Sequence, residues 1–152
     1  MRKTNLGIVV KNGKILLCMK KRGFGMGLWN SAGGKLDECE TMEECMIREL
    51  KEETNLDTKK EGIEMAGILY FHFLDNPDWN NECHIFRINE FTGTPIETEE
   101  MLPEWYNLDL IPYDKMWKDD IIWLPRVIAG EQIEYELYFD KEGNVADYKK
   151  LK

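Results

Sequence analysis

Residues 34–56 read GKLDECETMEECMIRELKEETNL and contain the pattern that decides the fold. Glu49, Glu52 and Glu53 are spaced i, i+3 and i+4, so on a helix their carboxylates project from one face. Like charges at this spacing destabilise an isolated helix. We therefore expect a cation beside them, and a hard divalent metal that takes oxygen ligands is the best candidate.

Local signals predict that these acids lie on a helix. Thr41 and Glu44 have the spacing of a capping box, in which each side chain bonds the other residue's backbone amide. From Glu43 to Thr54 the sequence contains neither glycine nor proline. Asn55 can take the left-handed conformation that ends a helix. We therefore expect a helix that starts after Thr41 and stops at Asn55.

The helix alone leaves two interpretations open. Arg48 precedes Glu52 by four residues and can pair with it, which fits a charged face exposed to solvent. The preceding residues 29–34 read WNSAGG, and adjacent glycines let a backbone come close to a ligand. This small-residue loop favours a ligand site over a solvated face.

The same stretch resembles the signature of the Nudix family, G-x5-E-x7-REU-x-EE-x-G-U, where U is aliphatic. Gly34, Glu40 and the REL at 48–50 stand at the required spacings, and Asn55 replaces a glycine. Three further segments resemble the MutT-homologue subfamily, which hydrolyses oxidised purine nucleoside triphosphates: MKKRGFG at 19–25, ETEEMLP at 97–103 and MWKDD at 116–120. This similarity runs along nearly the whole chain.

Two residues depart from the subfamily pattern. Ala32 stands where a bulky aromatic is expected, and Cys39 stands where glycine is usual. Ala32 could alter packing near the base pocket, whereas Cys39 lies in a loop.

The resemblance implies a metal site that binds Mg²⁺, with Mn²⁺ as a substitute. Glu49 and Glu53 would bind the metal with help from Glu52, and one glutamate would accept the proton of the attacking water. Two or more ions could bridge the phosphates. By charge alone the acidic run at 97–100 would be a solvated loop, and only the resemblance assigns Glu100 a role. The predicted catalytic and metal-binding residues are Gly33, Arg48, Glu49, Glu52, Glu53 and Glu100.

The resemblance also implies a base pocket. Adjacent aspartates in a partly apolar pocket cannot both ionise cheaply, so one of Asp119 and Asp120 should have a raised pKa. A protonated aspartate donates a hydrogen bond and an ionised one accepts, which suits an oxidised purine edge. By residue type alone the pair would be a helix N-cap and a first-turn acid. The predicted substrate-binding residues are Lys20, Asn30, Phe71, Met101, Trp117, Asp119 and Asp120.

Length and composition predict one domain spanning 1–152. The net charge of −9 argues against nucleic-acid binding, which wants a basic face. Four cysteines form no CxxC pair and predict reduced thiols of a cytoplasmic protein. No apolar run is long enough for a membrane span. We expect a monomer whose partner is a small-molecule nucleoside triphosphate.

The order of elements predicts an α+β fold. Strands are expected at 6–10 and 14–19, joined by a hairpin at Asn12-Gly13, and at 63–74, 84–91, 104–108 and 132–139. A second helix is expected from about Asp119 to Ala129. Strands interrupted by helices favour a mixed sheet between helices, and the resemblance implies the same arrangement, a Nudix-type α/β/α sandwich.

The predicted function is Mg²⁺-dependent hydrolysis of oxidised purine nucleoside triphosphates of the 8-oxo-dGTP type to monophosphate and pyrophosphate, which clears damaged precursors. One alternative is a Nudix hydrolase of another nucleoside diphosphate derivative, such as an unmodified nucleotide, a dinucleoside polyphosphate or a nucleotide sugar. A second alternative is a nucleotide sensor without turnover, although a sensor need not keep the three glutamates of the Nudix signature, Glu49, Glu52 and Glu53.

Overall fold

A hairpin opens the computed structural model, which describes all 152 residues, and six further strands and two α-helices follow it. Asn12 and Gly13 have φ of 53° and 76°, the left-handed pair that a tight two-residue turn requires. The elements are β1 (Arg2–Lys11), β2 (Lys14–Lys20), β3 (Trp29–Asn30), α1 (Met42–Thr54), β4 (Ile63–Phe73), β5 (Asn81–Ile88), β6 (Met101–Asn107), α2 (Asp120–Ile128), β7 (Ile133–Phe139) and β8 (Val145–Lys150).

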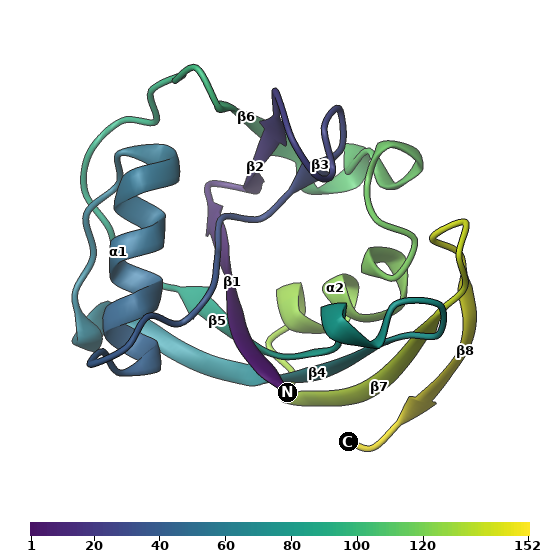
Figure 1. Ribbon diagram of the computed structural model, residues 1–152. Coiled ribbons are helices and arrows are strands. Elements are labelled where there is room, and N and C mark those ends of the chain that lie inside the picture. Colours follow the sequence, from purple (N-terminus) through teal and green to yellow (C-terminus); the bar gives the residue numbers. More distant parts are fainter.

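The strands form one mixed sheet in the order β3-β2-β1-β5-β4-β7-β8, with β6 on the far side of β2. The β1/β5 and β4/β7 pairs are parallel, and the other pairs are antiparallel. Strands β1 and β2 pair only beside their turn. Beyond it they separate, so that β2, β3 and β6 lie across from the larger curved set β1, β5, β4, β7 and β8 (Figure 1).

Helix α1 is stabilised at both ends by the predicted signals. The Thr41 hydroxyl accepts from the Glu44 amide at 3.1 Å, and the Glu44 carboxylate accepts from the Thr41 amide at 2.8 Å. Asn55 ends the helix with φ of 69°. The predicted helix and both of its caps are therefore confirmed.

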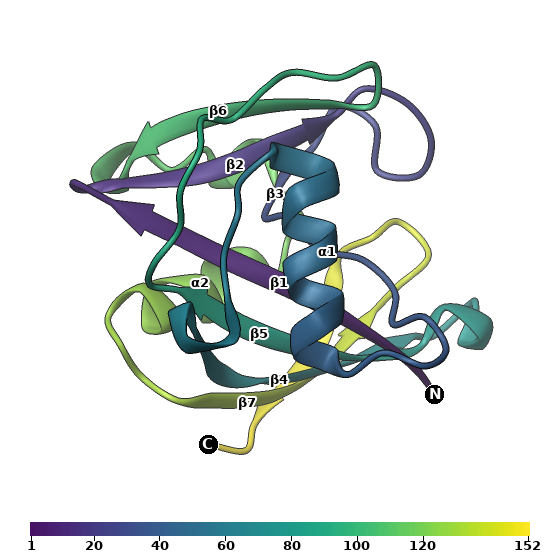
Figure 2. The same ribbon diagram turned by 90° about the vertical axis from the view of Figure 1, so that its left-hand side faces the viewer.

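The two helices lie against different core clusters. Helix α1 contributes Met46 and Leu50 to a cluster that also contains Val9 and Phe86, from β1 and β5. Helix α2 contributes Trp123 and its neighbours to a larger cluster on the other side. Figure 2 shows α1 in front of the strands and α2 behind them. The predicted α+β sandwich, with a mixed sheet between helices, is confirmed.

Ala32 lies in the α1 cluster and is not among the residues that line the cavity of the candidate site, so its effect on packing near the base stays a prediction. It pairs with Gly7 through an isolated bridge and is 3% exposed. A side chain added at Gly7 would come within 2.8 Å of the Met46 methyl. Met46 thus packs directly against Gly7 and shares a core cluster with Ala32.

Several boundaries differ from the sequence-based expectations. Strand β5 begins and ends three residues earlier than predicted, and β3 and β8 were not expected. β8 reads VADYKK and is almost entirely exposed, so it has no apolar alternation to reveal it. Neither α-helix is long and apolar enough to cross a membrane.

Replacing Leu50 by alanine should lower the free energy of unfolding by about 2–5 kcal/mol, because the side chain is completely buried beneath α1. Urea denaturation with Ile121→Ala as the control tests this. Ile121 is 58% exposed on α2, and its truncation should change the free energy by less than about 0.5 kcal/mol. Equal effects of the two substitutions would contradict the assigned core.

Candidate active site

A cavity of about 320 Å³ lies where the ends of several strands meet the start of α2 and the end of α1. It is partly apolar, with acidic groups at separate positions along its wall. Its lining includes most of the predicted site residues, which come from distant parts of the sequence: Lys20, Asn30, Gly33, Glu53, Phe71, Met101, Trp117, Asp119 and Asp120.

The first acidic position is formed by α1 and the WNSAGG loop. One Glu53 carboxylate oxygen accepts from the Gly33 amide at 2.9 Å. A Cβ added at Gly34 would lie 2.4 Å from the Glu49 carboxylate, so only glycine leaves room for that group. The two glycines therefore bring the backbone directly against Glu49 and Glu53.

Arg48 is the cation that lies beside the other glutamates of the Nudix signature. Its guanidinium donates to Glu40 at 2.8 and 3.1 Å and to Glu49 at 3.0 Å. It also pairs with Glu52 at 3.3 Å, as the i,i+4 spacing predicts. The hydrogen bonds from Arg48 hold the pKa of the Glu40 carboxyl at about 2. Arg48 thus orients Glu49 and leaves Glu53 without a cationic hydrogen-bond partner.

Burial, together with the charge of Glu49, raises the pKa of Glu53 to about 7, against the opposing effects of the Gly33 amide and Lys20. Burial also raises the pKa of Glu49, against the opposing hydrogen bond from Arg48. Two half-buried or buried carboxylates with raised pKa values attract a cation, because a bound cation favours their charged forms.

The structure does not gather all of the predicted metal ligands. No group of three or more acidic, histidine or cysteine side chains is arranged to hold a metal ion. The Glu52 side chain is 57% exposed and faces Arg48. Glu100 does not line the cavity; its carboxylate is 67% exposed and pairs with Arg22 at 3.1 Å. The metal-binding roles of Glu52 and Glu100 stay predictions.

The second acidic position is the pair Asp119 and Asp120, each only 3% exposed. Asp119 accepts from the indole nitrogen of Trp123 at 2.7 Å. Asp120 has a buried carboxylate oxygen, Oδ2, without any hydrogen-bond partner. Asp119 stands at the N-cap position of α2 but its side chain makes no capping bond, so capping does not explain the pair.

Burial raises the pKa of both aspartates, to about 6 for Asp119 and well above the ordinary value for Asp120, where the Asp119 charge adds to the effect. Since these pKa values exceed those of the unfolded chain, the folded state holds extra protons between pH 4 and 6. Stability that is present below pH 4 is therefore lost as the pH rises.

Asp120→Asn should remove much of this loss. As the pH rises from 4 to 7, the free energy of unfolding should fall more in the wild type than in the variant. The slope is up to about 1.4 kcal/mol per pH unit for each proton that unfolding releases. Urea denaturation of both proteins in metal-free buffers across this range measures the difference. A difference that does not change with pH would contradict the buried, protonated state of this pair.

Other cavity residues carried no motif in the sequence. Asn5 is buried in β1; its side-chain oxygen accepts from the Gly34 amide at 3.1 Å, which fixes the glycine turn. Cys18 lines the cavity from β2, and burial together with the Glu53 charge raises its pKa to about 12. A polar residue in the apolar run NLGIVV was the only signal for Asn5, and nothing marked Cys18.

The sequence is similar to two proteins that carry the same name. The chain is 40% identical over 139 residues to the oxidized purine nucleoside triphosphate hydrolase of Danio rerio, covering 91% of this chain and 86% of that protein. It is 38% identical over 143 residues to the protein of the same name in Mus musculus, covering 94% and 90%.

The fold has a similar counterpart in the crystal structure of a MutT protein from Bacillus halodurans. The TM-score is 0.86 at 21% identity, over 99% of this chain and 98% of that one. The NUDIX domain model matches residues 1–127, which contain the signature at 34–56, the adjacent glycines 33 and 34, and the aspartate pair. The chain therefore belongs to the NUDIX domain family.

Proposed function

We propose that the protein hydrolyses oxidised purine nucleoside triphosphates of the 8-oxo-dGTP type to the monophosphate and pyrophosphate. One observation carries the proposal: a single cavity joins the buried Glu53 carboxylate to the buried aspartate pair. A polyphosphate needs cations and a proton acceptor at one end, and an oxidised base needs donors and acceptors at the other. The acids at the Glu53 end would bind the cations and accept the proton, and the aspartate pair would donate to and accept from the base.

Glu49 and Glu53 would hold Mg²⁺ at the phosphate end, with Mn²⁺ as a substitute. Their raised pKa values and the adjacent backbone of Gly33 fit a hard cation that prefers oxygen. When bound, the metal neutralises phosphate charge and lowers the pKa of a water ligand. Lys20 lines the same cavity and would contact phosphate or sugar.

Glu53 is also suited to accept a proton from the attacking water. Its carboxylate lines the cavity beside the Gly33 amide, and a bound cation would keep it in the charged form that accepts a proton. Arg48 would act on the reaction only through Glu49, by holding its carboxylate in place.

Asp119 and Asp120 would read the base. The unpartnered Asp120 oxygen is positioned to bond a group on a ligand, as a donor when protonated and as an acceptor when ionised. Asn30 accepts from the Ser31 amide at 2.8 Å, so its amino group remains free to donate. Trp117 offers a stacking face, worth about 1–3 kcal/mol for a base. Phe71 and Met101 would complete the apolar wall.

All of these side chains come from one chain, so the proposed site is complete in a monomer. No second subunit and no nucleic acid is needed to form it. The four cysteines are free thiols, which fits the proposed cytoplasmic location.

A substrate panel with Mg²⁺ tests the proposal against its alternatives. Pyrophosphate release should be fastest with an oxidised purine triphosphate. Preference for an unmodified nucleotide, a dinucleoside polyphosphate or a nucleotide sugar would assign the protein to another Nudix activity. Tight nucleotide binding without product would identify a sensor.

A further inference from the structure

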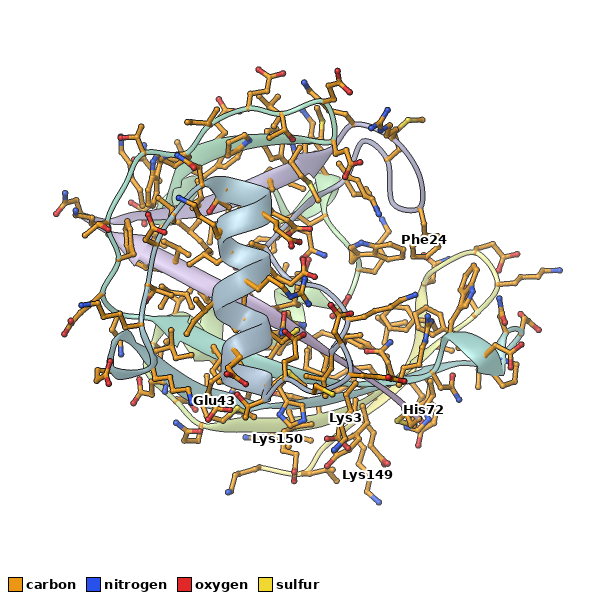
Figure 3. All side chains as sticks on the ribbon, turned by 60° about the vertical axis from the view of Figure 1, so that its left-hand side comes forward. Lys3, Phe24, Glu43, His72, Lys149 and Lys150 are labelled. Carbon is orange, nitrogen blue, oxygen red and sulfur yellow. The ribbon has the colours of Figure 1, made fainter.

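A second hollow, of about 420 Å³, lies beside the base end of the cavity and shares Phe24, Phe73 and Trp117 with it. We refer to it as the side cavity. Its other walls belong to the turn after β4 and the β7–β8 hairpin: Asp75, Asn76, Trp79, Asp140, Lys141, Glu142 and Gly143. Figure 3 shows Phe24 beside the tip of that hairpin. None of the predicted catalytic roles uses these other walls.

Four aromatic rings form one connected wall of the side cavity. The Phe24 ring lies 4.8 Å from Trp79 and 5.3 Å from Trp117, and Phe73 lies 5.7 Å from Trp79, measured between centroids. Trp79 is 41% exposed and Phe24 is 57% exposed. Large aromatic faces left open beside a hollow favour a flat ligand that would cover them.

The rim of the side cavity is acidic. Its lining contains three acidic residues, Asp75, Asp140 and Glu142, and one basic residue, Lys141. Asp140 accepts from the backbone amides of its own turn at 3.0 Å. The carboxylates of Asp75 and Glu142 take part in no ion pair or hydrogen bond of the fold, although the Glu142 backbone amide donates to Asp140. Their charges are therefore available to a ligand and would repel phosphate.

We propose that the side cavity binds a flat aromatic cation of the N-alkylated heterocycle class. Aromatic faces attract such a cation through their quadrupoles, and tryptophan does so most strongly. Two free carboxylates at the rim add charge complementarity. A neutral ring would gain only the stacking. An anionic nucleotide could stack as well, but its phosphates would be repelled by the carboxylates. Because Phe24, Phe73 and Trp117 also line the nucleotide cavity, occupancy of one cavity should change affinity at the other.

The test compares 1-methylnicotinamide with nicotinamide, which have the same ring and differ in charge. Titration followed through the tryptophan indole NMR signals, without metal or nucleotide, measures both affinities. We expect the cation to bind at least about fivefold more tightly and to shift the Trp79 signal. The result does not depend on whether the protein hydrolyses nucleotides.

Variants separate the side cavity from the base pocket. Trp79→Ala and the double variant Asp75→Asn/Glu142→Gln should each weaken 1-methylnicotinamide binding by about fivefold or more. The control Glu61→Gln/Glu90→Gln removes two exposed charges that lie outside both cavities. It should leave the affinity for 1-methylnicotinamide unchanged. Equal affinity for the two ligands, or undiminished binding in both side-cavity variants, would overturn the proposal.

Discussion

Glu53→Gln should lower kcat for an oxidised purine triphosphate by about 10²–10⁴-fold at saturating Mg²⁺. Glutamine keeps the shape of the side chain and can still accept from the Gly33 amide, as Glu53 does at 2.9 Å. It cannot take up a proton from water, and it carries no charge to bind a cation. Steady-state pyrophosphate release, with Mg²⁺ raised until the rate is constant, measures the effect.

Glu52→Gln is the matched control. Its carboxylate lies one residue away on the same helix but is 57% exposed and pairs with Arg48. We expect a loss of about tenfold at most, since a group that assists in orientation contributes less than the group that carries the proton. Wild-type kcat in the Glu53 variant would remove that residue from the chemistry.

Asp119→Asn should change the ratio of kcat/KM for 8-oxo-dGTP over dGTP by about 10–100-fold, because buried polar groups discriminate strongly between bases that can and cannot pair with them. The amide oxygen can still accept from Trp123, whose indole lies 2.7 Å away, so the start of α2 should keep its structure. Kinetics with both nucleotides under the same conditions give the ratio.

Asp114→Asn serves as the control, since Asp114 is an exposed aspartate outside the cavity. It should leave the ratio unchanged. An unchanged ratio in Asp119→Asn as well would exclude this aspartate from base recognition. A change in kcat alone, equal for both nucleotides, would lead to the same conclusion.

The features that sequence predicted best are those encoded within a few residues. Thr41 and Glu44 cap α1 through bonds across one turn, and Asn12-Gly13 closes the first hairpin with two left-handed residues. The aspartate pair is different: residue type alone suggested a helix cap, and only the family resemblance predicted that both residues line the cavity.

The features that sequence did not predict depend on distant strands. The parallel pairing of β1 with β5 brings Thr4 opposite Cys83, and no local pattern announces such a pair. Asn5 reaches Gly34 only because these strands and the glycine loop meet in space. Ala32 pairs with Gly7 of β1 and packs in the α1 core cluster, another contact between segments far apart in the sequence.

The acidic cluster shows the limit of helical spacing as a guide. The i, i+3 and i+4 positions correctly place three glutamates on one side of α1. Spacing does not determine which of them is buried. The glycine loop covers Glu53 and Glu49, whereas Glu52 remains at the surface with Arg48.

Crystals soaked with Mn²⁺ and a nucleotide test the metal site most directly. The account predicts anomalous density at the carboxylates of Glu49 and Glu53, beside the phosphates of the nucleotide, since such a cation prefers oxygen ligands. Ions bound elsewhere, with both carboxylates turned away from the phosphates, would contradict it.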